Sequence, residues 1–289
     1  MKCLKTILAG MLSFVALVTS AGTVKITDIG AVFETGDYGV RLSKDISWTI
    51  REITFKDKTL MRDCLGAFNG TVLKTRGKES GKDDWVGTGH GCEVVESVTL
   101  FIDEKEQEIK DGVVYSGSEF RFVKSSDLRV LKLEATIIIN DSGILERHRY
   151  AVSGTKVNIS VFYIFMHSFD ASMKEWLVKT SEDKLVSGNF TGSARHSFDG
   201  DIQWASLYSP VAKAGVAYVL KPAPGKAFHF FWDRAHDRKL YFCGPSENIR
   251  KMNEGDSFEY TVKLVGFEAL EDVWKEKAAK LTEMEKEGF

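Results

Sequence analysis

The sequence KVNISVFYIFMHSFD, residues Lys156 to Asp170, decides the fold class. Apolar side chains fill both alternating sets of positions in it, which is typical of a strand buried on both faces inside a sandwich. Strict alternation predicts that Tyr163 and Phe165 share one face of this strand. The run ends at His167, where a rigid strand holds an imidazole beside a loop, a favourable position for ligand binding or chemistry. The alternative is a histidine at the edge of the core that bonds only to backbone.

Short strands surround this stretch. Between residues 24 and 267, apolar runs alternate with turn residues and predict about sixteen strands, too many for an immunoglobulin-like module. Leu270, Val273 and Trp274 begin a run of apolar residues at helical spacing, which predicts an amphipathic helix over residues 268–287 anchored by Trp274. The predicted fold class is therefore all-β: a large antiparallel β-sandwich, or supersandwich, with one C-terminal α-helix.

The first 22 residues have the layout of a secretory signal peptide. Lys2 and Lys5 precede an apolar run from Ile7 to Val18, and small residues follow it. The run is too short for a comfortable membrane span, although an uncleaved anchor is the alternative. We expect the mature chain, residues 23–289, to be secreted or periplasmic, free of the membrane and folded as a single domain, because no repeat or linker divides it.

Charge and cysteine content restrict the partners. The 39 basic residues nearly balance the 41 acidic ones, and no basic patch of the size that a phosphate backbone requires is present, so we expect no nucleic acid partner.

Cys64, Cys92 and Cys243 follow the signal, an odd number that cannot all pair. A bridge between Cys64 and Cys92 suits an oxidising compartment, but we expect all three to be small core residues. No spacing matches a metal or phosphate site, so no cofactor is expected.

His90 lies in a glycine-rich loop, WVGTGHGC, that runs from Trp85 to Cys92. Small neighbours allow a ligand to approach the backbone, and packing does not explain an imidazole there. We interpret His90 as the first functional histidine and Trp85 as a substrate-binding residue. The alternative is a tight turn that merely exposes the histidine.

Arg147 and His148 are two further candidates for substrate binding. They lie in a predicted strand whose outward face would carry Glu146, His148 and Tyr150. Such a polar row is compatible with the floor of a sugar cleft, but an ordinary solvated face is the interpretation that the pattern favours.

The segment FHFFWDRAHDRKLYF, residues 228–242, is the densest cluster of site-like residues. Trp232 is suited to stack on the apolar face of a sugar ring, and Lys239 is a further candidate for substrate binding. The side chains suited to bond hydroxyl or carboxylate groups are Asp233, Arg234, His236 and Arg238. Metal ligation by the acidic residues and the histidine lacks a matching third element elsewhere in the chain. The remaining alternative is a plain hairpin with a charged turn.

A general base is sought among the late carboxylates Glu247, Glu254 and Glu259. A carboxylate in an apolar cleft gains proton affinity, and a facing histidine is then the complementary acid. Spacing alone does not select among the three.

Several of these features together resemble the galactose mutarotase-like superfamily, large β-sandwiches that bind carbohydrate. They are an opening that reads YGVRLSKDISWTIREITFKDKTLM at residues 38–61, the glycine-flanked His90, the strand-ending His167, and late strands rich in Trp and Gly. In aldose epimerases of this superfamily, one histidine protonates the ring oxygen, a second holds the sugar, and a late glutamate removes the anomeric proton. The resemblance implies catalytic roles for His167 and His90, with Glu247 or Glu259 as the base. The sequence HSFDAS differs from the His-x-Tyr-Phe-Asn of typical aldose epimerases, and the same fold also occurs in polysaccharide lyases.

The sequence thus predicts a carbohydrate-active protein. Its cleft would be formed by the Trp85–Cys92 loop, the strand end at His167 and the Trp232–Lys239 hairpin. The expected activity is proton transfer on a sugar, as in an aldose 1-epimerase or a polysaccharide lyase. The alternative is a non-catalytic glycan-binding or structural domain. The geometry of the site distinguishes the enzyme from the binding domain, because the enzyme requires His90, His167 and a late glutamate in one pocket.

Overall fold

The computed structural model describes most of the chain. The described residues are 21–62, 69–76, 83–90, 93–153, 157–221, 228–235, 237–244 and 250–288. Outside them lie nearly all of the predicted signal peptide, and Cys64, Cys92, His236 and Glu247.

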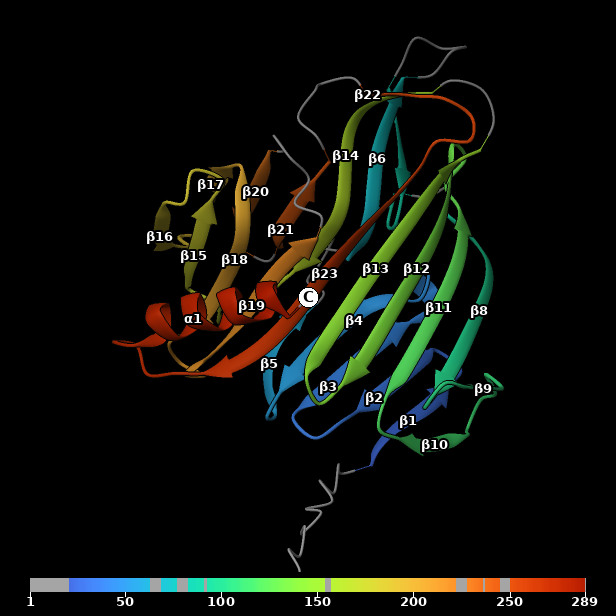
Figure 1. Ribbon diagram of the computed structural model, residues 1–289, viewed down its shortest axis with the longest axis horizontal. Coiled ribbons are helices and arrows are strands. Elements are labelled where there is room, and N and C mark those ends of the chain that lie inside the picture. The colour runs from blue at the N-terminus through green and yellow to red at the C-terminus, as the bar shows by residue number, and fades with distance from the viewer. Residues whose placement is uncertain are drawn as a thin grey trace, which may run out of the picture.

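The strands form three antiparallel sheets (Figure 1). The six-stranded sheet has the order β10 (Val114–Gly117), β1 (Gly22–Thr27), β2 (Gly30–Glu34), β3 (Tyr38–Ser43), β4 (Thr49–Phe55) and β5 (Lys58–Arg62). The ten-stranded sheet has the order β16 (Leu185–Asn189), β15 (Glu175–Thr180), β18 (Ile202–Ser209), β19 (Ala214–Lys221), β23 (Ser257–Glu268), β13 (Gly143–Val152), β12 (Leu131–Asn140), β11 (Phe120–Asp127), β8 (Val94–Ile102) and β9 (Lys105–Gln107). The seven-stranded sheet has the order β17 (Ser193–Gly200), β20 (His229–Arg234), β21 (Asp237–Cys243), β14 (Val157–Ser168), β6 (Gly70–Arg76) and β7 (Asp83–Gly87), and β22 (Arg250–Met252) pairs with β14. A short 3-10 helix spans Lys44–Ile46, and α1 spans Trp274–Glu287.

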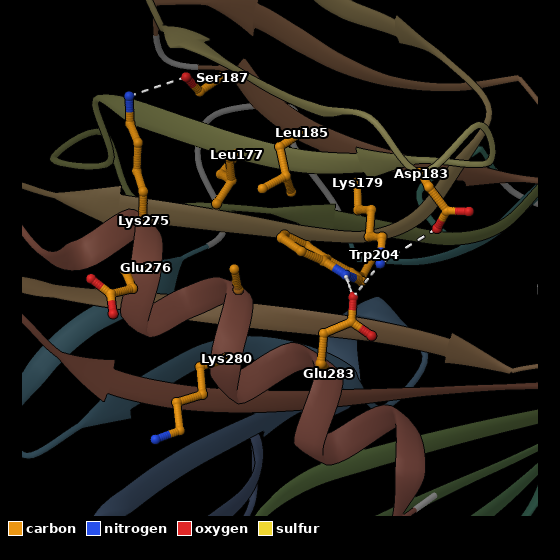
Figure 2. A pocket seen from close by; sticks show the side chains of 11 residues that line it. Leu177, Lys179, Asp183, Leu185, Ser187, Trp204, Lys275, Glu276, Lys280 and Glu283 are labelled. Atoms are coloured by element: carbon orange, nitrogen blue, oxygen red, sulfur yellow. Dashed lines mark hydrogen bonds and ion pairs between the residues drawn. The ribbon is translucent and has the colours of Figure 1, made fainter.

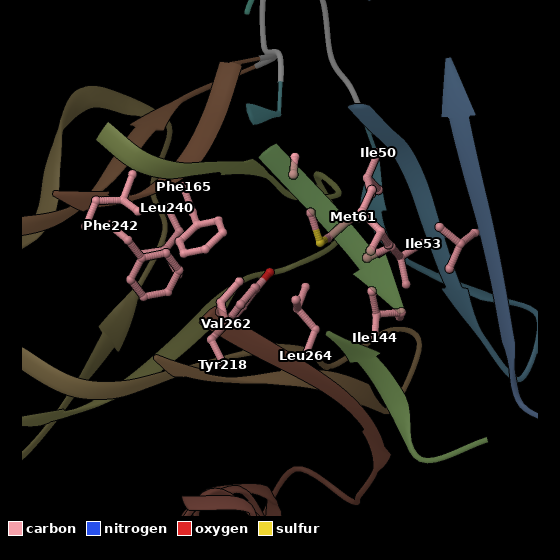
Figure 3. Close-up of a cluster of buried hydrophobic side chains, with 14 of the residues drawn as sticks. Ile50, Ile53, Met61, Ile144, Phe165, Tyr218, Leu240, Phe242, Val262 and Leu264 are labelled. Atoms are coloured by element: carbon pink, nitrogen blue, oxygen red, sulfur yellow. The ribbon is translucent and has the colours of Figure 1, made fainter. Parts of the chain in front are cut away.

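This architecture confirms the predicted all-β sandwich with a C-terminal helix. The ten-stranded sheet crosses the whole molecule, and the other two sheets pack against its inner face (Figure 1). One continuous core fills the space between them, and Figure 3 shows a part of it drawn from all three sheets: Ile50, Ile53, Met61, Ile144, Phe165, Tyr218, Leu240, Phe242, Val262 and Leu264. Burial of these apolar surfaces is the main stabilising contribution of the fold.

The decisive stretch forms β14, which lies between β21 and β6 in the seven-stranded sheet. The pairing of β14 with β21 shifts register between Tyr163 and Phe165, a β-bulge. Phe165 therefore points inward, with its ring 4.4 Å from that of His148 on the facing sheet, whereas Tyr163 stacks on Trp85 at 6.1 Å on the other side. The prediction that Tyr163 and Phe165 share a face is wrong, because an extra residue at a bulge interrupts the alternation.

Helix α1 packs on the outer face of the ten-stranded sheet. Trp274 is fully buried, stacks on Tyr208 with ring centroids 4.9 Å apart, and donates its indole N–H to Glu175 at 2.9 Å. The predicted anchor is thus confirmed. Leu270 and Val273 do not belong to the helix as predicted: they precede it in a turn and are exposed. Among the described residues, no helix is long and apolar enough to cross a membrane.

A groove of about 690 Å³ lies between α1 and strands β15, β16 and β18 (Figure 2). On its floor, Trp204 donates its indole N–H to Glu283 at 3.1 Å, and Lys179 reaches the same carboxylate at 2.7 Å. At the other end of the groove, Lys275 lies 3.0 Å from the Ser187 hydroxyl. These contacts attach the helix to the sheet by polar as well as apolar groups.

Candidate functional site

Aromatic side chains gather on the face of the seven-stranded sheet that is turned away from the ten-stranded sheet. We call this set the aromatic face, and it comprises Trp85, His90, Tyr163, His196, Phe228, Phe230, Trp232 and Tyr241. Regular alternation places most of its members: on β21 the ring of Tyr241 lies on this face while Leu240 and Phe242 point into the core (Figure 3).

The rings of the aromatic face contact one another in sequence across the sheet. From Trp85 on β7, the ring of Tyr163 on β14 is 6.1 Å away, and that of Tyr241 on β21 follows at 4.6 Å. From Tyr241, the ring of Phe230 on β20 lies at 4.4 Å and stacks in turn on His196 of β17 at 4.3 Å. The set therefore forms a continuous row of rings rather than isolated aromatics.

Exposure is greatest at the two ends of this row. Trp85 is 39% exposed and Phe228 is 43% exposed, whereas Phe230 between them is only 8% exposed. A contiguous exposed apolar patch rimmed by polar groups commonly marks a binding surface, whereas single exposed apolar side chains do not. The ends are accordingly the parts of the row that a ligand can cover most fully.

Polar groups interrupt the aromatic face on β21. The ammonium nitrogen of Lys239 lies 3.1 Å from Oδ1 of Asp237, and Trp232 donates its indole N–H to Oδ2 of the same carboxylate at 3.3 Å. The Lys239 nitrogen also lies 5.9 Å from the centre of the Tyr241 ring. Lys239 is itself buried, and the side chain of Asp237 is 25% exposed, so Asp237 is the more accessible of the two charges. A few polar groups among aromatic rings are typical of ligand sites.

His90 stacks on Trp85, with ring centroids 5.5 Å apart and an angle of 25° between the planes. Partial burial against the indole, and then the positive charge of Lys239, lower the pKa of His90. The imidazole is therefore neutral at neutral pH, and it can accept a hydrogen bond or a proton. The two predicted regions, the Trp85 loop and the Trp232–Lys239 hairpin, thus meet on one face.

His167 lies elsewhere. Its side chain is 1% exposed, its Nε2 is 2.9 Å from Oε1 of Glu146, and its ring is 5.7 Å from that of Tyr218 on the facing sheet. It therefore points into the sandwich, on the opposite side of the seven-stranded sheet from His90. The described residues do not bring His90 and His167 into one cleft.

Glu146, His148 and Tyr150 point into the sandwich with His167. All three are buried, so the solvated face that the sequence favoured for them is wrong. The physical reason is that β13 lies in the middle of the ten-stranded sheet and its even positions face the other two sheets. Nδ1 of His148 lies 3.1 Å from the Thr71 hydroxyl, and burial lowers the pKa of His148 to about 4. Burial alone would raise the pKa of Glu146, but His167, His148 and Lys124 together outweigh it and the pKa is lowered.

The remaining predicted residues are scattered. Nε of Arg147 lies 3.5 Å from Oε1 of Glu259 on the outer face of the ten-stranded sheet, where both side chains are about half exposed. Arg234 is exposed at the turn end of β20. His236 and Glu247 fall outside the described residues. Of the late carboxylates, Glu259 thus does not join the aromatic face.

Sequence reasoning assigned no function to five members of the aromatic face: Tyr163, His196, Phe228, Phe230 and Tyr241. Phe230 and Tyr241 could have been found, because they alternate with core residues inside the segment already singled out. His196 gave no signal, because β17 is largely exposed and lacks an apolar alternation. Among the described residues, no group of three or more His, Cys, Asp or Glu side chains is placed to hold a metal ion.

The fold itself is shared with known proteins, although no family model and no curated protein matches this sequence. Galactose 1-epimerase from Lactobacillus acidophilus superposes with a TM-score of 0.50 at 10% identity, over 87% of this chain and 99% of that one. A galactose mutarotase-like protein from Lactobacillus casei gives 0.50 at 9% identity, over 82% and 99%. The alpha-galactosidase from Lactobacillus brevis gives 0.52 at 10% identity, over 86% of this chain but 39% of the enzyme. At this identity the likeness concerns the fold alone, which is the galactose mutarotase-like β-supersandwich that the sequence resembles.

Proposed function

We propose that this protein binds carbohydrate on the aromatic face. The observation that carries the proposal is the row of ring faces from Trp85 to His196 with Lys239 and Asp237 placed among them. Aromatic planes stack on the apolar faces of sugar rings, while charged and amide groups bond the hydroxyls. Solved structures with this fold include a galactose 1-epimerase and an alpha-galactosidase, which supports a sugar as the ligand.

Binding is better supported than anomeric epimerisation. Epimerisation needs an acid and a base at one sugar ring. Among the described residues, His167 is enclosed in the sandwich and Glu259 lies on the outer face of the other sheet, so neither can meet a sugar that contacts His90.

Lyase-type proton abstraction is a second candidate, favoured by the neutral imidazole of His90 near Lys239. In this reaction His90 takes the proton on C5 of a uronate residue, the bond from C4 to the glycosidic oxygen breaks, and a C4=C5 double bond forms. The departing oxygen takes a proton from a tyrosine, and burial raises the pKa of Tyr163 to about 12, so that its hydroxyl still carries that proton at neutral pH. Lys239 would offset the charge of the uronate carboxylate.

We also propose export of the protein, on the basis of the signal-like residues 1–22 alone. An exported protein of this kind meets polymeric glycans outside the cell. Amino-terminal sequencing of protein secreted by a native or heterologous host tests this part, and a mature chain that still begins at residue 1 in the cytoplasmic fraction contradicts it.

Binding is tested by affinity electrophoresis of the wild-type protein in gels that contain neutral or uronate-rich polysaccharides. Loss of one stacking contact in Trp85→Ala should weaken retention roughly tenfold. Leu185→Ala is the matched control, because Leu185 is 58% exposed on β16, away from the aromatic face. Equal retention of wild type and Trp85→Ala would show that the aromatic face is not the binding site.

The lyase candidate has its own readout. Uronate polysaccharides mixed with the protein should gain ultraviolet absorbance from the unsaturated product, and His90→Ala should abolish that gain while weakening retention in the gel no more than Trp85→Ala does. If the wild-type protein produces no absorbance from a polysaccharide that it retains, the catalytic candidate is refuted and binding stands.

A further inference from the structure

We infer that the ligand of the aromatic face is a chain of several sugar residues laid across the strands, and not a single sugar. The inference rests on the proposed carbohydrate binding and specifies its substrate class. It follows from how far the rings extend and from where they are exposed.

The row of rings spans the width of the seven-stranded sheet. Trp85 lies on β7 and His196 on β17, which are the first and last strands in the order β17-β20-β21-β14-β6-β7. Successive ring centroids along the row lie 6.1, 4.6, 4.4 and 4.3 Å apart, so its two ends are separated by at most about 19 Å. One sugar ring, which is comparable in size to one aromatic ring, can cover only a small part of that length.

Two exposed platforms lie at the ends of this span. The first platform is Trp85 with His90, and the second platform is Phe228 with His196, whose rings are 6.3 Å apart. The rings between them, those of Tyr163, Phe230 and Tyr241, are more covered. A ligand that stacks on both platforms must therefore be long enough to reach from one platform to the other. Contacts at two linked points strengthen binding of a chain far more than binding of its separate units.

The polar groups favour a carbohydrate chain over an apolar partner. Lys239 and Asp237 lie between the platforms, paired at 3.1 Å, and Asp237 also accepts the indole N–H of Trp232. Lys239 is already buried, whereas the side chain of Asp237 is 25% exposed. An apolar protein segment would cover this carboxylate without new hydrogen bonds, which is costly. Sugar hydroxyls can donate hydrogen bonds to it.

The test is calorimetric titration of the full-length mature protein with oligosaccharides of increasing length. The probes are the cello-, xylo-, manno- and galacturono-oligosaccharide series, each from the monosaccharide to the hexasaccharide. For the series that binds, affinity should rise at least roughly tenfold between the disaccharide and the hexasaccharide, in line with the gain of a second stacking contact.

Two single variants test where the oligosaccharide binds. Trp85→Ala removes the first platform and Phe228→Ala removes the second, and each should lower hexasaccharide affinity roughly tenfold, to that of the short oligomers. The side chains of Trp85 and Phe228 are 39% and 43% exposed, so both variants should remain folded, and Leu185→Ala should bind as the wild type does.

The outcomes separate the two proposals. A monosaccharide bound as tightly as its hexasaccharide overturns the extended-chain inference and leaves carbohydrate binding intact. The same inference fails if Phe228→Ala binds the hexasaccharide as the wild type does while Trp85→Ala does not. Absence of binding to every probe and every polysaccharide, with binding of an apolar peptide instead, overturns carbohydrate binding itself.

Discussion

Replacing Lys124 by methionine should destabilise the protein strongly, and replacing its partner as well should restore most of the loss. Lys124 is almost fully buried; its ammonium nitrogen lies 2.7 Å from Oε1 of Glu93 and 2.7 Å from the Ser47 carbonyl oxygen. The other carboxylate oxygen of Glu93 accepts the Thr88 hydroxyl at 2.7 Å. Lys124→Met keeps the length of the side chain but leaves the carboxylate of Glu93 buried without its cation.

The expected cost follows from that geometry. Removing one partner of a buried ion pair costs about 3–5 kcal/mol, because an uncompensated charge remains, whereas replacing both partners by apolar residues is often close to neutral. We therefore expect Lys124→Met to lose about 3–5 kcal/mol of unfolding free energy and Lys124→Met/Glu93→Leu to lose about 1 kcal/mol. Urea denaturation followed by fluorescence measures both, with Lys132→Met as the control, because Lys132 pairs with Glu96 on the exposed surface.

The pH dependence gives the same reasoning a second check. Burial alone would raise the pKa of Glu93, but the charge and hydrogen bond of Lys124, with the hydroxyls of Thr88 and Ser126, outweigh it, so that the pKa lies below its ordinary value of 4.5. The stability from this pair is present above pH 4.5 and is lost as the pH falls through the folded pKa. A single variant Lys124→Met that is no less stable than the double variant would refute the claim that the buried charges compensate each other.

Three further predictions concern other parts of the molecule. Trp274→Ala should cost about 3–5 kcal/mol of unfolding free energy in thermal or urea denaturation, because a fully buried indole stacked on Tyr208 is lost; a cost below about 1 kcal/mol would contradict anchoring of α1 by Trp274. His148 has a folded pKa of about 4 against an ordinary value of 6.5, so unfolding free energy should fall by about 3 kcal/mol as the pH drops from 6.5 to 4. His148→Gln should flatten that slope, and an unchanged slope would assign it to other groups. Burial raises the pKa of the Cys243 thiol and makes it unreactive in the folded protein. In a variant whose other cysteines are replaced by serine, Ellman's reagent should therefore label Cys243 only after unfolding. Rapid labelling of the native protein would contradict the burial of Cys243.

The elements with strong periodic signals could be predicted from the sequence. The central strand predicted at Lys156–Asp170 and the helix anchored by Trp274 are both present. A long apolar run and a helical spacing indicate a strand or a helix whatever the surrounding tertiary structure is. The weakly patterned strand β17 was missed, because most of its side chains are exposed and nothing in its sequence separates it from a loop.

The candidate site was harder to predict than the fold. The Trp85 loop and the Trp232–Lys239 hairpin were chosen because Trp, His, Lys and Asp are suited to sugar binding, and the structure places both on one face. The positions of His148 and His167 could not be predicted, since the side of a strand that faces the core depends on which sheets lie above it. A single sequence does not contain that information.

The bulges in β14 and β17 connect the aromatic face to the interior. In β17 the register shifts between His196 and Phe198, so that His196 stacks on Phe230 outside while Phe198 contacts Trp176 inside; β14 does the same with Tyr163 and Phe165. Each bulge determines which side chains of its strand point inward and which point outward. One residue more or fewer would therefore exchange the inward-facing and outward-facing side chains of the strand, although its composition would hardly change. Substitutions can therefore change the aromatic face without changing the core. An insertion or deletion within β14 or β17 would instead change the side chains that point into the core at the same time.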